Sequence, residues 1–180
     1  MKTNKLLSVV LTLCVLLAAF SLTALAAEGD VAKIGDVGYA TLAEAIAAAK
    51  DGNTVTLTAD TIEDVTIDKN ITLDLGTKTL TNAGAGKATL TVAKGATATV
   101  KNGSIVGGAS YYTIQNNGTA TFEELTATAG NTGSSMLDNW GDLTINSGTY
   151  IGGLDTVKSL LLQYHIICGK QDEHRESEVR

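Results

Sequence analysis

The sequence predicts an all-β protein, a right-handed single-stranded parallel β-helix with a short capping helix at its N-terminal end. Three observations support this prediction. A nine-residue pattern occurs four times, polar and apolar residues alternate within each copy, and corners rich in Gly and Asn separate the copies. The copies start about 22 to 25 residues apart, and short strands repeated at such a period are typical of a solenoid, in which each circuit pairs with the next.

Residues 1–26 have the layout of a secretory signal peptide. Lys2 and Lys5 precede an apolar run over residues 6–20, and Ala24 and Ala26 place small side chains at the −3 and −1 positions of a cleavage site. The apolar run is shorter than the roughly 20 residues that a membrane-spanning helix needs. We therefore expect cleavage near Ala26 and a secreted or surface-exposed mature chain without a membrane segment.

Residues 27–60 are predicted to form an N-terminal cap that contains a strand, a helix over residues 41–50 and the first strand of the solenoid. Thr41 and Glu44 match a capping box, and Gly52 matches a helix stop. The segment NTVTLTAD that follows alternates as a strand does. A cap of this kind protects the first strand edge of a solenoid from pairing with other chains.

Residues 61–153 are predicted to form the circuits of the β-helix. The four copies begin at Ile67, Val92, Ile114 and Leu137. Their ninth positions are apolar and are predicted to stack inside the solenoid: Leu75, Val100, Phe122 and Ile145. Their eighth positions, which face outward, hold Asp or Thr. Five residues after each ninth position, a further residue recurs in all four copies and predicts a second short strand that follows a turn. These residues are Leu80, Ile105, Ala127 and Tyr150.

Residues 154–180 differ in composition from the circuits. Both His, both Arg and Cys168 lie here, and none of these residue types occurs between residues 27 and 153. The segment fits a degenerate last circuit, a helical C-terminal cap, or a truncated or frame-shifted end with a loose tail. If it is a loose strand, the apolar stretch 160–168 would favour end-to-end self-association of the chain.

The segment VAKIGDVGYATLAEAIAAAKDGNTVTLTAD (31–60), followed by circuits rich in Asn, Gly and Thr, resembles the entry segment of secreted bacterial β-helix proteins. These belong to the pectate-lyase-like fold group, and the likeness is in particular to cell-surface proteins of Gram-positive gut bacteria. The resemblance extends over residues 31–153. It implies a surface module with a structural or adhesive role, whereas other members of the group are polysaccharide lyases and hydrolases.

Charged residues in the circuits favour a protein without catalytic activity. The lyases that the chain resembles bind calcium through Asp clusters and remove a proton with a basic side chain, but no second Lys or Arg accompanies Lys101. A hydrolase needs a close pair of carboxylates. The candidates are Asp60, Glu63, Asp64, Asp68, Asp74, Glu123, Glu124, Asp138, Asp142 and Asp155. Only Asp138 and Asp142 approach a pair. We predict no enzyme activity, metal ion or cofactor, with a lyase or hydrolase fragment as the alternative.

Trp140 is the candidate ligand contact, with Asp138 and Asp142 on either side of it. Because an indole at a corner can stack against a sugar ring, a polysaccharide or a host or cell-surface glycan is the expected partner. Thr-x-Thr segments at 97–99 and 119–121 raise an ice-binding protein as a further alternative. Without Lys2 and Lys5, 11 basic and 19 acidic residues leave a net charge of −8, which disfavours nucleic acid as a partner.

Overall fold

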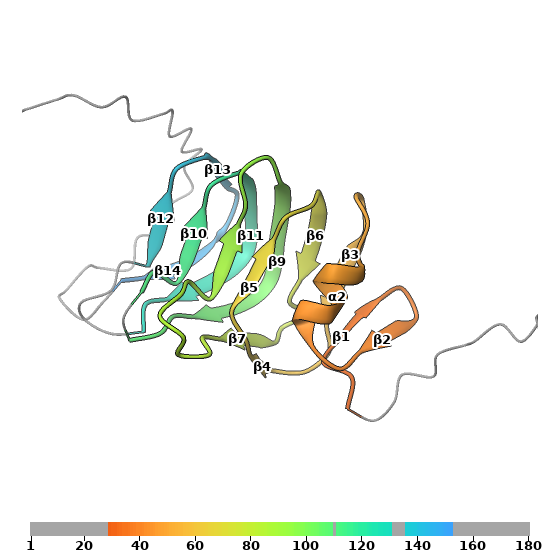
Figure 1. Cartoon of the computed structure of the whole chain (residues 1–180). Helices are drawn as coiled ribbons and strands as arrows, with labels where there is room; N and C mark the ends of the chain where they lie inside the picture. The colour runs from red at the N-terminus through yellow and green to blue at the C-terminus, as the bar shows by residue number, and fades with distance from the viewer. Residues whose placement is uncertain (1–28, 110, 131–135, 153–180) are drawn as a thin grey trace, which may run out of the picture.

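The computed structural model describes residues 29–109, 111–130 and 136–152, which form a parallel β-solenoid of about four circuits with one short helix (Figure 1). The predicted β-helix is therefore confirmed. The predicted signal peptide lies outside the described residues. The segment beyond residue 153, for which a last circuit, a cap or a loose tail was expected, lies outside them too.

The strands belong to two sheets. The larger sheet contains β1 (Ala32–Ile34), β2 (Val37–Tyr39), β3 (Thr54–Leu57), β4 (Thr61–Ile62), β6 (Ile71–Asp74), β7 (Thr79–Thr81), β9 (Thr97–Val106), β11 (Thr119–Thr128), β13 (Asp142–Ile145) and β14 (Gly148–Ile151). The smaller sheet contains β5 (Val65–Ile67), β8 (Leu90–Val92), β10 (Ile114–Asn116) and β12 (Leu137–Asn139). From β3 onward, the strands of successive circuits pair in parallel (Figure 1).

An antiparallel hairpin and the helix form the N-terminal cap. Strand β1 pairs with β2 on one side and with β3 on the other, so the hairpin covers the first edge of the larger sheet. Helix α2 (Leu42–Ala48) is shorter than the predicted helix 41–50. It ends because Ala49 is extended, with ψ 149°. Gly52 is not its stop: this glycine has φ +83° and donates its N–H to the carbonyl oxygen of Asn70 at 2.7 Å.

A side chain from the solenoid completes the N-terminal cap of helix α2. The Thr41 hydroxyl accepts a hydrogen bond from the Glu44 N–H at 3.1 Å, which is half of the predicted capping box. The Glu63 carboxylate, from the residue after β4, accepts bonds from the N–H groups of Leu42 and Ala43, each at 2.9 Å. A negative charge at this end also complements the helix dipole.

Lys69 caps the C-terminal end of helix α2. Its Nζ donates to the carbonyl oxygens of Ile46 at 3.0 Å and Ala47 at 2.6 Å, which lie in the last turn, where carbonyl groups lack an ordinary helical partner. Glu63 and Lys69 therefore tie both ends of the helix to the circuit on which it lies. A helix of seven residues is too short to be stable alone, so burial of its apolar face, through Leu42, Ala45 and Ile46, and these bonds together stabilise it here.

Replacing Glu63 by alanine is expected to lower the free energy of unfolding by about 1–2 kcal/mol, because two helix amides lose their acceptor. Urea denaturation measures this loss. Glu123→Ala is the matched control, since within the described part of the chain that carboxylate accepts only from the exposed Asn146 side chain, at 3.0 Å. Equal losses for the two variants would contradict the capping role of Glu63.

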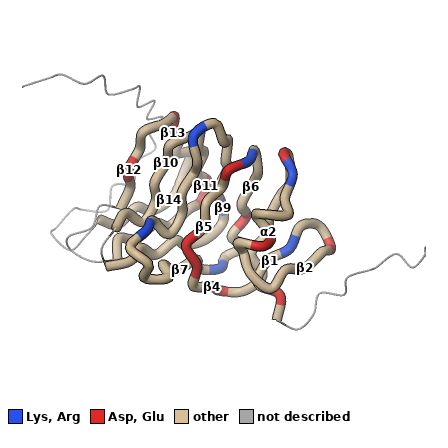
Figure 2. The backbone as a smooth tube through the Cα atoms, in the orientation of Figure 1, with Lys and Arg blue, Asp and Glu red and all other residues tan. Residues whose placement is uncertain are grey.

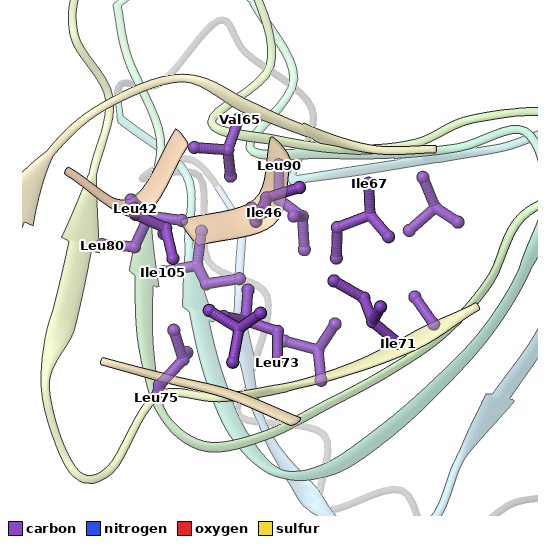
Figure 3. Packing of buried hydrophobic residues seen from close by; sticks show 14 of the residues in the cluster. Leu42, Ile46, Val65, Ile67, Ile71, Leu73, Leu75, Leu80, Leu90 and Ile105 are labelled. Atoms are coloured by element: carbon purple, nitrogen blue, oxygen red, sulfur yellow. The ribbon is translucent and has the colours of Figure 1, made fainter. Parts of the chain in front are cut away.

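The core is a stack of apolar side chains between the two sheets, closed at one end by helix α2. Figure 3 shows Leu42 and Ile46 of the helix among side chains of both sheets. Phe122 is fully buried and lies in register with Val100 on one side and Ile145 on the other. A second set of stacked residues was predicted five positions after the ninth residue of each copy. Its members pair with one another on successive strands, as predicted: Leu80, Ile105, Ala127 and Tyr150.

Two predicted contacts between neighbouring copies are wrong, one in each sheet. Leu73, and not Leu75, pairs with Val100, although Leu75 is also fully buried. In the smaller sheet, the partner of Ile114 is Leu90 rather than the predicted Val92. The copies that start at Ile114 and Leu137 do pair position by position, as predicted.

Unequal corners explain both register errors. Residues 93–96 connect β8 to β9, whereas residues 68–70 connect β5 to β6 and only residues 117–118 connect β10 to β11. Five residues separate Val92 from Ala98, but only three separate their partners Ile67 and Ile71. A nine-residue frame cannot hold across a corner that is two residues longer. We call this segment the 93–96 corner. It is closed by the Ala96 N–H donating to the Ala93 carbonyl oxygen at 3.1 Å.

Strands β9 and β11 also differ from the prediction of two strands separated by a turn. Each runs for 10 residues without interruption. Within each strand one residue has a positive φ, Asn102 at 60° and Glu124 at 49°. A single residue in the left-handed region bends the strand while the pairing continues on both sides of the bend.

Candidate ligand-binding site

The corner that joins the smaller sheet to β11 and β13 is held by a ladder of asparagines. Asn116 is fully buried, and its Nδ2 donates to Asn139 Oδ1 at 2.7 Å and to the Asp142 carbonyl oxygen at 3.0 Å. Its Oδ1 accepts from the Gly118 N–H at 3.2 Å. Asn139 in turn donates to the Gly141 carbonyl oxygen at 3.0 Å. These bonds fix the shape of two successive corners.

Gly118 and Gly141 bring the backbones of neighbouring corners into contact. A Cβ placed on Gly141 would overlap the carbonyl oxygen of Gly118, and a Cβ on Gly118 would overlap the carbonyl oxygens of Ala93 and Ala96. Only glycine allows such an approach. The corner is therefore a stack of close backbone layers, in which the longer 93–96 corner packs directly against Gly118.

An open depression of about 230 Å³ lies on this corner. It is lined by Gly95, Asn117, Gly118, Thr119, Trp140, Gly141 and Asp142. Gly95, which has φ +85°, belongs to the 93–96 corner, so the extra length of that corner supplies one wall. The Trp140 side chain is 72% exposed although it is the largest in the depression. We call this feature the Trp140 depression.

Three polar side chains in the Trp140 depression have no hydrogen-bond partner among the described residues. They are the amide of Asn117, the hydroxyl of Thr119 and the carboxylate of Asp142. The backbone, in contrast, is hydrogen-bonded within the corner. The Asp142 N–H donates to the Gly118 carbonyl oxygen at 2.9 Å, and the Thr119 N–H donates to the Ala96 carbonyl oxygen at 2.9 Å. The depression thus offers a rigid backbone with an amide, a hydroxyl and a carboxylate open to a ligand.

The structure separates the three predicted contact residues. Trp140 and Asp142 share the depression, but Asp138 does not line it. Asp138 lies on β12, where its Oδ2 accepts a hydrogen bond from Gln115 Nε2 at 3.1 Å. Sequence reasoning missed Asn117 and Thr119. The repeat itself is the signal that could have identified them, because they occupy the positions of Trp140 and Asp142 in the preceding copy.

Several of the other candidate carboxylates have structural hydrogen bonds. Those that accept bonds from backbone N–H groups are Asp60, Glu63, Asp64 and Asp74. Asp155 lies outside the described residues. Within residues 29–109, 111–130 and 136–152, no three His, Cys, Asp or Glu side chains gather in a group that could hold a metal ion.

A column of threonines lies on the outer face of the larger sheet. Its members pair in register on successive strands: Thr54, Thr72, Thr99, Thr121 and Thr144. The column is longer than the sequence alignment predicted, because Thr72 and not Asp74 lies beside Thr99. Asp74 pairs with Lys101, with 3.8 Å between Oδ2 and Nζ, in a neighbouring column that carries charge.

Comparison with protein-family models, with curated proteins and with solved structures finds no match to this chain. In the part of the chain that the structure describes, no helix has the length and apolar character to cross a membrane.

Proposed function

We propose that this chain is a secreted or cell-surface β-solenoid module without catalytic activity, and that its Trp140 depression binds a glycan. The observation that carries the proposal is an exposed indole beside three polar side chains without partners among the described residues. Sugar rings present C–H groups that stack on an aromatic face and hydroxyls that pair with amides, hydroxyls and carboxylates. The Trp140 depression provides all of these groups within one open surface.

Features of the sequence support the location. Residues 1–26 have the layout of a signal peptide. The resemblance of residues 31–153 to cell-surface β-helix proteins of the pectate-lyase-like group agrees with an extracellular, adhesive role. The rigid corner suits adhesion because Gly118 and Gly141 fix the position of the indole-bearing backbone before a ligand arrives, so little ordering is needed on binding.

A glycan array probed with the labelled chain tests the proposal. We expect at least one class of oligosaccharide to bind, and Trp140→Ala to weaken that binding about tenfold, since loss of one stacking contact removes about 1.4 kcal/mol. Ile62→Ala is the matched control, because Ile62 is 71% exposed but lies on β4, away from the depression. Absence of any bound glycan, or equal binding by Trp140→Ala, would show the proposal to be wrong.

A further inference from the structure

We propose that the Trp140 depression selects amino sugars that carry an unmodified, protonated amine, and that Asp142 provides this selectivity. This inference rests on the proposed glycan binding and names the chemical class of the glycan. It follows from three features of the described residues: the charge within the depression, the chemistry of the indole, and the net charge of the described part of the chain.

Among the described residues, Asp142 is the only ionisable one that lines the depression. Its carboxylate is exposed and has no partner among the described residues, while its backbone N–H and carbonyl oxygen are held by Gly118 and Asn116. The backbone of Asp142 is therefore held in place by hydrogen bonds, whereas its carboxylate makes none with the described residues. A carboxylate in this state accepts a strong charge-assisted hydrogen bond from an ammonium group and repels another carboxylate.

The indole of Trp140 favours the same ligand. The face of an aromatic ring carries a partial negative charge that attracts cations, and tryptophan is the strongest of the aromatic residues in this respect. A protonated amine on a stacked sugar can therefore interact with the ring and with Asp142 together. A uronic acid in the same place would meet an anionic side chain and the negative face of the ring.

The described part of the chain carries a net negative charge. The described residues include 13 Asp and Glu against 7 Lys, with neither Arg nor His among them. Figure 2 shows where the acidic and basic residues lie along the backbone. The basic residue next in sequence to the depression is Lys94, which precedes Gly95 in the 93–96 corner and is exposed, but it does not line the depression. Lys94 should reduce the preference for a cation in part, so its removal should increase the selectivity that Asp142 creates.

The full chain can be titrated with glucosamine oligosaccharides, with their N-acetylated counterparts and with galacturonic acid oligosaccharides of equal length, at a pH where the amines are protonated. Trp140 is the only tryptophan of the chain, so its fluorescence reports binding at the depression itself. We expect the glucosamine oligosaccharides to bind about fivefold more tightly than the N-acetylated ones, which corresponds to one solvent-exposed ion pair, and galacturonic acid to bind most weakly. Added salt should reduce this preference.

Two variants distinguish the inference from the proposed function. Asp142→Asn should lower the preference for the unmodified amine to the part that the indole supplies, while it still binds the N-acetylated series, and Lys94→Gln should increase this preference. If the wild-type chain binds both series equally, or if Asp142→Asn keeps the full preference of the wild-type chain, the selectivity is overturned while glycan binding stands. If no oligosaccharide changes the Trp140 fluorescence or appears on the array, the proposed function itself fails.

Discussion

Phe122→Ala is expected to lower the free energy of unfolding by about 3–5 kcal/mol, the range for truncating a buried aromatic residue. Phe122 has no exposed surface and lies between Val100 and Ile145 in the inner stack. Its ring also stacks against that of Tyr150, with 6.4 Å between the ring centroids. Alanine would leave a cavity at the centre of the last described circuits, where the parallel strands prevent collapse. Urea denaturation followed by circular dichroism measures the loss.

Thr121→Ala is the matched control for this variant. Thr121 precedes Phe122 on the same strand but faces outward in the threonine column, between Thr99 and Thr144. Its truncation should cost well under half of the Phe122 value, since only partly exposed contacts and strand propensity are lost. Comparable losses at the two positions would mean that the inner and outer faces of β11 are assigned the wrong way round.

Gly141→Ala is expected to destabilise the chain by about 3 kcal/mol, although it adds a single methyl group. The added Cβ would overlap the backbone of Gly118, which cannot move because the 93–96 corner packs on its other side. The neighbouring corners would have to separate, and the hydrogen bond from the Asp142 N–H to the Gly118 carbonyl oxygen would be strained. Thermal unfolding monitored by circular dichroism tests this expectation.

Gly152→Ala controls for the general effect of removing a glycine. A Cβ at Gly152 would have no heavy atom within 4 Å, and its backbone is not in the left-handed region. The stability of this variant should stay within about 0.5 kcal/mol of the wild-type value. A loss as large as that of Gly141→Ala would show that close packing of the corner is not the cause.

The sequence predicted the circuits well where their corners have equal lengths. Between Ile114 and Ile145, alternation at period two identifies the inward residues, and the repeat of the nine-residue pattern identifies their partners. The prediction failed for the pairs Leu75–Val100 and Val92–Ile114 because the two additional residues of the 93–96 corner shift one sheet against the other, whereas Val92 does pair with Ile67 as predicted. Side-chain periodicity contains no information about how the chain crosses a corner, and this length had to come from the structure.

The cap and the site depend on contacts that are distant in sequence. Thr41 and Glu44 are local, so the start of helix α2 could be predicted, whereas Glu63 and Lys69 reach the helix from 21 and 22 positions further along the chain. Trp140 could be identified as a corner residue, but its exposure depends on how neighbouring corners pack. Asp138 was grouped with Trp140 by proximity in sequence, although a pleated strand turns it towards Gln115.

Partner residues in the last two described circuits are equally spaced in sequence. Because of this spacing, the solenoid could be lengthened without a change in the register or the inward faces of its strands. Insertion of one more unit of this size would keep every inward residue inward and would place each corner glycine over the one before it. The molecule would become longer by about 4.8 Å, the separation of neighbouring strands. Partner residues would remain one circuit apart in sequence, so the relative contact order would fall as the chain grows, and a longer version need not fold more slowly.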